Sequence, residues 1–191
     1  MMTNIQIRPA TREDALLIAQ AVFLAIGEKT SIEYCGPRPI QTLVAMAQSD
    51  DSQYSYRNAF VAEADGQPAG AVVGYDGALL KVLRSATFRI LQEQTGKIPD
   101  VEEETAAGEF YIDTLAVLPP YQGLGLGRRL LQSMTNHAFA EGHLKVGLLV
   151  DFDNPRAEKL YAGIGFLRVA EKSFFGHRMW HMQTDSSSSR E

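Results

Sequence analysis

The sequence contains a single cysteine, Cys35, among its 191 residues. One thiol cannot form a disulfide within the chain, and it argues against a cysteine-based metal site. Histidine is also scarce, with four residues. Two of these, His177 and His181, share a strand face but would lie about 13 Å apart along it. We therefore expect no metal site.

The sequence also lacks a long apolar run and an excess of positive charge. No stretch approaches the roughly 18 apolar residues of a membrane span, and the first residues contain no apolar signal region. The 18 basic and 23 acidic residues give a net charge of −5. This argues against a nucleic-acid-binding protein, which usually presents a basic face. We expect a cytoplasmic protein that binds neither a membrane nor nucleic acid.

The composition, with 45% hydrophobic and 21% charged residues, is that of a soluble globular domain. Hydrophobic periodicity predicts alternating strands and helices. The predicted strands are 5–8, 58–64, 69–75, 109–117, 145–150, 165–172 and 177–182. The predicted helices are 15–26, 40–48, 80–94, a segment around 130–139, and 155–162.

This order of elements predicts one α/β domain with a mixed sheet. We assign residues 1–183 to the domain and residues 184–191, which contain four serines, to a disordered tail. Residues 76–108 are interpreted as an insertion between strands. Within this insertion, residues 101–105 are expected to form an exposed acidic loop.

Three alternating glycines, Gly123, Gly125 and Gly127, separate the strand at 109–117 from the next helix. Each costs roughly 0.5–1 kcal/mol relative to alanine in a helix, so this backbone freedom needs a reason. Glycines at a helix N-terminus expose amides that can bind a phosphate, and the basic Arg128 follows directly. The alternative explanation is a tight turn with close packing of helix against strand.

Two common phosphate-binding patterns do not fit the glycines. A dinucleotide-binding fingerprint needs a glycine or alanine where Arg128 stands. A Walker loop needs Gly-Lys-Ser/Thr, which the chain lacks. A third interpretation, a coenzyme A site, depends on the family resemblance that follows.

The segment Gln122-Gly-Leu-Gly-Leu-Gly127 resembles the loop motif Gln/Arg-x-x-Gly-x-Gly/Ala of the GCN5-related N-acetyltransferase (GNAT) family. A second motif of that family has an Asn, an Ala three residues on, a Tyr seven residues on, and then Gly-Phe. This chain matches it with Asn154, Ala157, Tyr161 and Gly165-Phe166. The resemblance is close over residues 109–166 and looser towards the N-terminus.

The resemblance implies a mixed sheet of about six or seven strands flanked by helices. Two parallel strands would splay apart to form the acyl-CoA cleft. Acetyl-CoA would be the co-substrate, with its pyrophosphate on the glycine loop and its pantetheine arm along the main chain of the preceding strand. The implied cofactor-binding residues are Leu115, Ala116, Val117, Gln122, Gly123, Leu124, Gly125, Leu126, Gly127, Arg128, Asn154 and Tyr161.

The implied reaction is transfer of the acetyl group to a primary amine of a small molecule or peptide, by direct attack in a ternary complex. Tyr161 is the expected general acid for the leaving thiolate, because a neutral phenol can donate a proton at neutral pH. The protonated amine needs a base. Asp113 is the first candidate, since an aspartate is out of place inside an apolar strand. Glu109 and Asp151 are the alternatives.

The acceptor is expected between the first helices, the insertion and residues 173–177. Several acidic residues there would suit a cationic amine, or form only a solvated surface: Glu28, Glu33, Asp50, Asp51 and residues 102–104. The exposed edges of a mixed sheet favour a homodimer. The alternative function is a non-catalytic coenzyme A sensor, because a fold does not determine its function.

Overall fold

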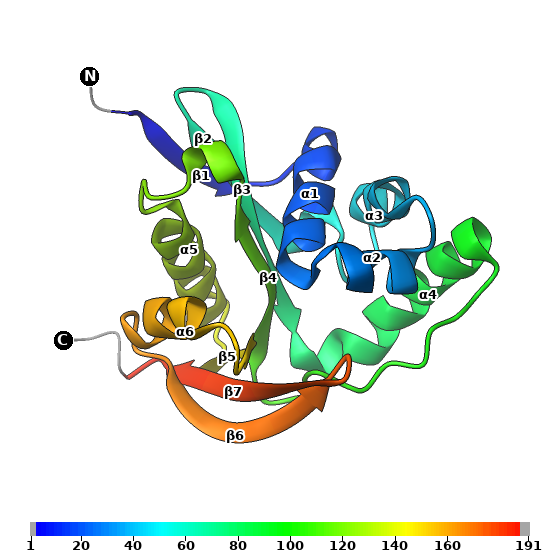
Figure 1. The fold of residues 1–191 in the computed structure, drawn as a ribbon. Helices are drawn as coiled ribbons and strands as arrows, with labels where there is room; N and C mark the ends of the chain where they lie inside the picture. The colour runs from blue at the N-terminus through cyan, green and yellow to red at the C-terminus, as the bar shows by residue number, and fades with distance from the viewer. Residues whose placement is uncertain (1–2, 188–191) are drawn as a thin grey trace.

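The computed structural model describes residues 3–187 and contains one mixed sheet of seven strands (Figure 1). Their spatial order is β1-β2-β3-β4-β5-β7-β6. The strands are β1 Ile5–Pro9, β2 Ala59–Ala64, β3 Gln67–Asp76, β4 Phe110–Val117, β5 Lys145–Asp151, β6 Leu167–Phe174 and β7 His177–Asp185. Neighbours are antiparallel except β4 and β5, which are parallel. The predicted α/β domain with a mixed sheet is confirmed.

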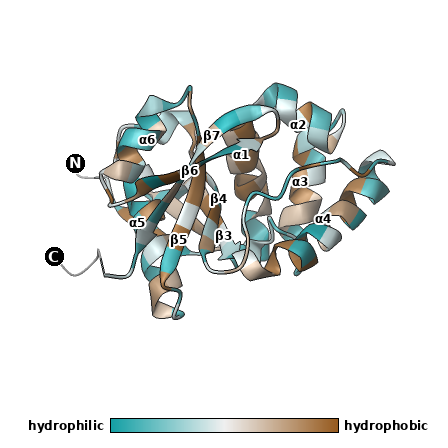
Figure 2. Ribbon diagram, turned by 90° about the horizontal axis from the view of Figure 1, so that it is seen from below, coloured by the Kyte–Doolittle hydropathy of each residue, from teal (hydrophilic) through white to brown (hydrophobic). Residues whose placement is uncertain are grey.

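Helices cover both faces of this sheet (Figure 1). One face carries α1 Ala15–Ile26, α2 Glu28–Cys35, α3 Pro39–Gln48 and α4 Leu80–Thr95, and the other carries α5 Leu126–Ala140 and α6 Pro155–Ala162. One apolar core packs Ile18 of α1 and Leu43 of α3 against β2 and β3. A second packs Leu130 of α5 against Leu148 of β5. Figure 2 shows hydrophobic residues along the central strands, whereas α6 is largely hydrophilic.

The parallel strands β4 and β5 separate after a short paired stretch. Residues 110–112 of β4 align with residues 146–148 of β5. Beyond them β4 continues to pair with β3 as far as Val117. The edge of β4 that faces β5 is therefore without a strand partner over residues 113–117. This confirms the predicted splay of two parallel strands.

Helix α2 is not among the predicted elements. Its eight residues, Glu28–Cys35, carry few apolar side chains, so no helical periodicity marks them. Gly27 and Gly36 bound the helix with φ angles of 80° and 79°, which a side chain rarely adopts. Buried Tyr34 and Cys35 attach this short helix to the core.

The predicted helix in the segment 76–108 is confirmed as α4. It ends at Gly96 in the left-handed conformation (φ 72°), as is common at helix C-termini. The chain then returns to β4 as a long loop. The expectation that residues 101–105 are wholly exposed is wrong, because Glu104 and Thr105 are each 2% exposed.

The prediction of a disordered tail over residues 184–191 is wrong at its start. Thr184 and Asp185 complete β7 and align with Val146 and Lys145 of β5. Thr184 is also buried, so the sheet gains a packed residue from this extension. Residues 188–191 lie outside the described part of the chain.

Within residues 3–187 no single helix is long and apolar enough to cross a membrane. Only Arg12–Ile26 taken together with α2 reaches that length and composition, and the two are bent by 114°.

Candidate active site

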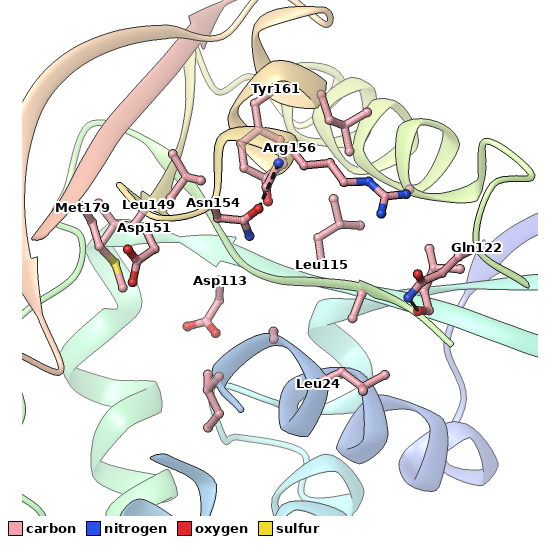
Figure 3. A pocket seen from close by; sticks show the side chains of 18 of the residues that line it. Leu24, Asp113, Leu115, Gln122, Leu149, Asp151, Asn154, Arg156, Tyr161 and Met179 are labelled. Carbon is pink, nitrogen blue, oxygen red and sulfur yellow. Dashed lines mark hydrogen bonds between the residues drawn. The ribbon is translucent and has the colours of Figure 1, made fainter. Parts of the chain in front are cut away.

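A cavity of about 720 Å³ opens where β4 and β5 separate. Its walls come from the end of α1, the free edge of β4, the glycine loop, the start of α5, the end of β5, α6, and the β6–β7 turn. Figure 3 shows Asp113, Asn154 and Tyr161 grouped around this cavity, with Gln122 set apart from them. Segments far apart in the sequence thus converge on one site.

Nearly all of the predicted site residues line this cavity. Those that do are Asp113, Leu115, Ala116, Val117, Gln122, Gly123, Gly125, Leu126, Gly127, Arg128, Asn154 and Tyr161. Leu124 is the exception: it is 42% exposed and does not line the cavity. Lining the cavity does not by itself assign a role, so the roles of these residues stay predictions.

The glycine loop leaves open space beside two of its glycines. Gly123 and Gly125 adopt left-handed φ angles of 84° and 76°. A Cβ atom built on either residue would meet no atom within 4 Å. Close packing of helix against strand therefore does not explain these two glycines, whereas a left-handed turn does. A side chain would fill the open space in front of the first amides of α5, where an anion is favoured.

Two side chains hold the loop in place. Gln122 donates from Nε2 to the main-chain oxygen of Val117 at 3.1 Å, which ties the loop to the end of β4. Arg128 donates from Nη1 to the main-chain oxygen of Gly163 at 2.9 Å, which ties α5 to the end of α6. The cavity wall is thereby organised by the chain itself.

Asn154 performs the predicted capping role at the start of α6. Its Oδ1 accepts a hydrogen bond from the amide of Ala157 at 3.1 Å. The same residue lines the cavity (Figure 3), so its side-chain Nδ2 is left to donate to a ligand. Capping and ligand binding are compatible at this position.

Tyr161 lies on α6, and its half-buried ring packs against the second core. Burial raises the pKa of its phenol to about 12. The hydroxyl is therefore protonated at neutral pH and can act as a proton donor. The raised pKa keeps the proton on Tyr161 but makes it a weaker donor than a free phenol, so its role as the general acid stays a prediction.

Asp113 lies on the free stretch of β4. Its Oδ2 accepts from the hydroxyl of Tyr75 at 3.0 Å, and its Oδ1 accepts from the hydroxyl of Thr114 at 3.1 Å. Burial and the nearby negative charge of Glu104 raise the pKa of Asp113 from 3.8 to about 7. A carboxylate with such a pKa can accept a proton efficiently at neutral pH.

Glu109, the first alternative base, does not line this cavity. It is buried and accepts from Thr105 Oγ1 at 2.7 Å and Gln183 Nε2 at 2.6 Å, and its Oε2 lies 2.8 Å from Nε2 of His181. Burial acts to raise its pKa, but the hydrogen bonds from His181, Gln183 and Thr105 outweigh it and lower the pKa. The structure gives Glu109 a place in the sheet interior rather than at the site.

Asp151, the second alternative, does line the cavity. Its Oδ2 lies 2.6 Å from Nδ1 of His177, and its Oδ1 accepts from the amide of Asp153 at 2.9 Å. Both carboxylate oxygens are therefore engaged. His177, which also lines the cavity, ends the segment 173–177 where the acceptor is expected, but the sequence does not reveal its contact with Asp151.

The wall nearest α1 and the β6–β7 turn lies where the acceptor is expected, among the first helices and residues 173–177. Its largely apolar character is not predicted from the sequence. The wall is formed by Leu24, Ala25, Ile26, Thr30, Phe174, Phe175 and Met179. Phe175 packs edge-on against Tyr34 of α2, with ring centroids 5.4 Å apart. The adjacent Gly176, with φ 73°, lies in the turn between β6 and β7. A Phe-Phe-Gly turn was the available signal.

The acidic residues expected around the acceptor do not line the cavity. Asp50 pairs with Arg12 at 2.9 Å, and Asp51 pairs with Arg89 at 3.0 Å. Their charges are therefore partly neutralised on the surface. Glu104 alone among the group is buried, and it acts on the site through Asp113.

Among residues 3–187, no group of three or more histidine, cysteine, aspartate or glutamate side chains could hold a metal ion. The single cysteine, Cys35, is buried away from the cavity, and burial raises the pKa of its thiol to about 12.

The family model described as "Acetyltransferase (GNAT) family" matches residues 29–166. The chain is 40% identical over 93 residues to a mycothiol acetyltransferase of Kocuria rhizophila, covering 48% of this chain and 30% of that protein. The chain thus spans less than a third of that relative. A crystal structure described as an acetyltransferase has 33% identity and a TM-score of 0.80, covering 94% of this chain and 98% of that one.

A putative acetyltransferase from Salmonella typhimurium, solved with its cofactor acetyl-CoA, has 18% identity and a TM-score of 0.64. That alignment covers 98% of this chain and 96% of the other, and it shows likeness of fold. The family match spans most of the chain and includes the glycine loop, β4 and the start of α6. The chain belongs to the GNAT acetyltransferase family.

Proposed function

We propose that the protein transfers the acetyl group of acetyl-CoA, the acetyl donor of its family, to a primary amine of a small molecule or peptide. The amine would attack directly in a ternary complex. The observation that carries this proposal is the meeting of Asp113 and Tyr161 in one cavity with the free edge of β4. The site thereby offers a proton acceptor, a proton donor and unpaired main-chain groups.

The chain's binding groups would be divided along the cavity. The amides at the start of α5 and Arg128 suit the pyrophosphate, since a helix N-terminus favours an anion. The main chain of residues 115–117 suits the amide-containing arm, which can hydrogen-bond to a strand edge. Asn154 offers a further donor. When bound, acetyl-CoA supplies the thioester carbon that the amine attacks and the thiolate that leaves.

Asp113 and Tyr161 would handle the protons of this reaction. Amines with a pKa near 10 are mostly protonated at neutral pH, so one proton must be removed before attack. Asp113 would accept it, because its pKa of about 7 leaves much of the carboxyl ionised at that pH. Tyr161 would donate its phenolic proton to the thiolate as the carbon–sulfur bond breaks.

The acceptor would be a cationic amine carried on an apolar body. The cavity wall near Asp113 is formed largely by apolar side chains of α1 and the β6–β7 turn, including Leu24, Phe174 and Phe175. An apolar acceptor that binds against this wall would gain roughly 25 cal/mol of binding free energy per Å² of apolar surface removed from water. In such an apolar setting, the carboxylate of Asp113 favours an acceptor whose buried end carries the amine as its one polar group.

Release of free thiol from acetyl-CoA, measured against a panel of amines, tests the proposal. We expect release only with an amine present, and a loss of roughly 10²–10⁴-fold in kcat for Asp113→Asn at pH 7. Asp100→Asn, on an exposed loop outside the cavity, is the control. Tight coenzyme A binding without turnover of any amine would favour a non-catalytic sensor. A cytoplasmic location and a homodimer stay predictions from the sequence.

A further inference from the structure

A buried polar network connects the 76–108 segment to Asp113. Glu104, in the loop after α4, is 2% exposed, and Tyr75 of β3 is 3% exposed. The Tyr75 hydroxyl lies 3.0 Å from Glu104 Oε1 and 3.0 Å from Asp113 Oδ2. A single phenol therefore bridges two carboxyl groups, one inside the cavity and one behind it.

The number of protons in this bridge is limited. A phenol carries one hydrogen, so Tyr75 can donate to only one carboxylate at a time. Its oxygen also accepts from Gln53 Nε2 at 3.1 Å, and Gln53 Nε2 lies 2.8 Å from Glu104 Oε1. For both carboxyl contacts to be hydrogen bonds, one carboxyl must carry a proton. The network thus has room for one additional proton.

Glu104 is the carboxyl group of the network that has a cationic partner. Its Oε2 forms an ion pair with the Arg84 guanidinium of α4. Arg84 also donates to the main-chain oxygens of Val101 at 3.1 Å and Glu102 at 2.9 Å, which holds the loop to α4. An opposite charge within a few ångströms favours the charged form of a carboxyl group. The extra proton therefore belongs on Asp113.

The loop is also fixed against the strand that carries Tyr75. A Cβ atom built on Gly77 would lie 2.2 Å from the main-chain oxygen of Ala106 and 2.7 Å from Oγ1 of Thr105. Only glycine permits this approach. Lys172 of β6 donates to the main-chain oxygen of Glu104 at 2.9 Å from the other side. The position of Glu104 is thus set from three elements of the fold.

We propose that Glu104 is a positioning residue that acts through Tyr75 to prepare Asp113 for taking the proton of the acceptor amine. This inference rests on the proposed function. In the resting site the Tyr75 hydrogen is donated to Asp113. When the amine loses its proton to Asp113, the new carboxyl hydrogen is donated to Tyr75, and the Tyr75 hydrogen turns to Glu104. An N–H bond breaks, an O–H bond forms on Asp113, and every group keeps a partner.

The charges around Asp113 agree with this role. Burial and the charge of Glu104 raise the pKa of Asp113, whereas the hydrogen bonds from Tyr75 and Thr114 and the charge of Arg84 act to lower it. The remaining neighbours of Asp113 are phenols whose pKa values are raised by burial, so they are neutral. They are Tyr34 of α2, Tyr54 before β2, Tyr75 of β3 and Tyr111 of β4. Asp151 and His177 face the same cavity from β5 and β7.

The test is a ¹³C NMR titration of the Asp113 carboxyl in the ligand-free protein, assigned with Asp113→Asn. We expect a midpoint near pH 7 in the wild type. In Glu104→Gln the midpoint should fall to about pH 6 or below, because a like charge is removed. In Tyr75→Phe it should rise, because a hydrogen bond to the ionised form is lost. Glu103→Gln, an exposed neighbour paired with Lys81, is the matched control.

Opposite shifts in the two variants support the inference, since general loosening of the fold would not move the midpoint in opposite directions. An unchanged midpoint in folded Glu104→Gln overturns it. If that variant does not fold, Tyr75→Phe keeps the ring and the Glu104–Arg84 pair, and an unchanged midpoint there overturns it equally. The acid limb of the kcat/KM profile should follow the NMR midpoint. Absence of acetyl transfer to every amine would reject the proposed function separately.

Discussion

Ile112 of β4 and Leu148 of β5 are the last residues at which the two parallel strands pair. From there β4 keeps its partner on one side, and its other edge opens into the cavity. Unpaired main-chain groups are costly unless water or a ligand satisfies them. The separation of these two strands therefore creates both the space and the hydrogen-bonding groups of the binding site.

The glycine loop can be tested by adding the same side chain at two left-handed glycines. Saturating acetyl-CoA, at about 100 times its Kd, should stabilise the wild type by about 2.7 kcal/mol. That corresponds to a rise in Tm of roughly 5–10 °C for a chain of this size. Gly125→Glu should abolish the rise, because the carboxylate fills the anion site.

Gly66→Glu is the matched control for this measurement. Gly66 has φ 75°, open space around its Cβ position and a place in the β2–β3 turn, outside the cavity. Both variants should lose basal stability through the strained backbone, but Gly66→Glu should keep the response to acetyl-CoA. An equal response in the two variants would return the glycines to the role of a packing turn.

Tyr161→Phe should separate chemistry from binding. Without the phenolic hydrogen the thiolate leaves unprotonated, so kcat should fall by roughly 10²–10⁴-fold, while the Kd for coenzyme A stays near its wild-type value. Steady-state kinetics and a binding titration measure the two quantities. Tyr56→Phe, whose hydroxyl binds Asp50 outside the cavity, should leave both unchanged. A variant that retains full kcat would remove Tyr161 as the acid.

Asp113→Asn should stabilise the folded protein, and more so at high pH. The folded pKa of Asp113 is raised to about 7, whereas the unfolded value is about 3.9. The unfolded chain thus loses its proton first, and the stability of the wild type falls between about pH 4 and pH 7. We expect the variant to gain on the order of 1–3 kcal/mol at pH 8 and little at pH 4.

Denaturant unfolding of wild type and Asp113→Asn at the two pH values measures this gain. Asp100→Asn, on an exposed loop, should show no comparable pH dependence. A wild type as stable as the variant at pH 8 would mean that Asp113 titrates as an ordinary carboxyl group.

Glu109→Gln should harm folding rather than catalysis. The folded pKa of Glu109 is lowered, so its contribution to stability is present above its unfolded pKa and is lost as the pH falls through the folded value. Losing a hydrogen-bonded buried carboxylate leaves its donors, Thr105 and Gln183, without their acceptor, which typically costs about 1–3 kcal/mol for each buried group. The deficit should therefore be large at pH 7 and shrink towards pH 3.

Thermal unfolding across pH, with kcat measured well below Tm, tests this assignment. The variant should keep a kcat close to wild type where it is folded, because Glu109 lies outside the cavity. A loss of kcat as large as that of Asp113→Asn would restore Glu109 as the base.

The parts of the site that lie close together in the sequence could be predicted from it. Gly123 and Gly125 mark a left-handed loop at the start of α5, and Asn154 marks the N-cap of α6, because these local conformations depend on the residue itself. Tyr161 then follows at a helical spacing. The strands and most helices follow from periodicity for the same reason.

Other features of the site depend on contacts with residues that are distant in the sequence. Glu109 and Asp113 share a face by strand parity, but only Asp113 reaches the cavity, since Glu109 lies over Gly147 beside His181. Glu104 is expected to be solvated from its acidic surroundings, yet Arg84 and Tyr75 enclose it. These contacts join residues that lie 20 or more positions apart, so no local sequence pattern predicts them.

The sequence by itself thus determined which local structures form: the glycine turn, the capped helix α6, the aspartate within an apolar strand and the α/β order. These local structures form because of backbone torsion preferences and the burial of periodic side chains, and both effects act over a few residues. The tertiary structure alone decided where β4 parts from β5, which carboxylate faces the cavity, and that Glu104 is buried behind it. Those outcomes depend on desolvation and on charges brought together across the fold, and these arise only once distant segments pack.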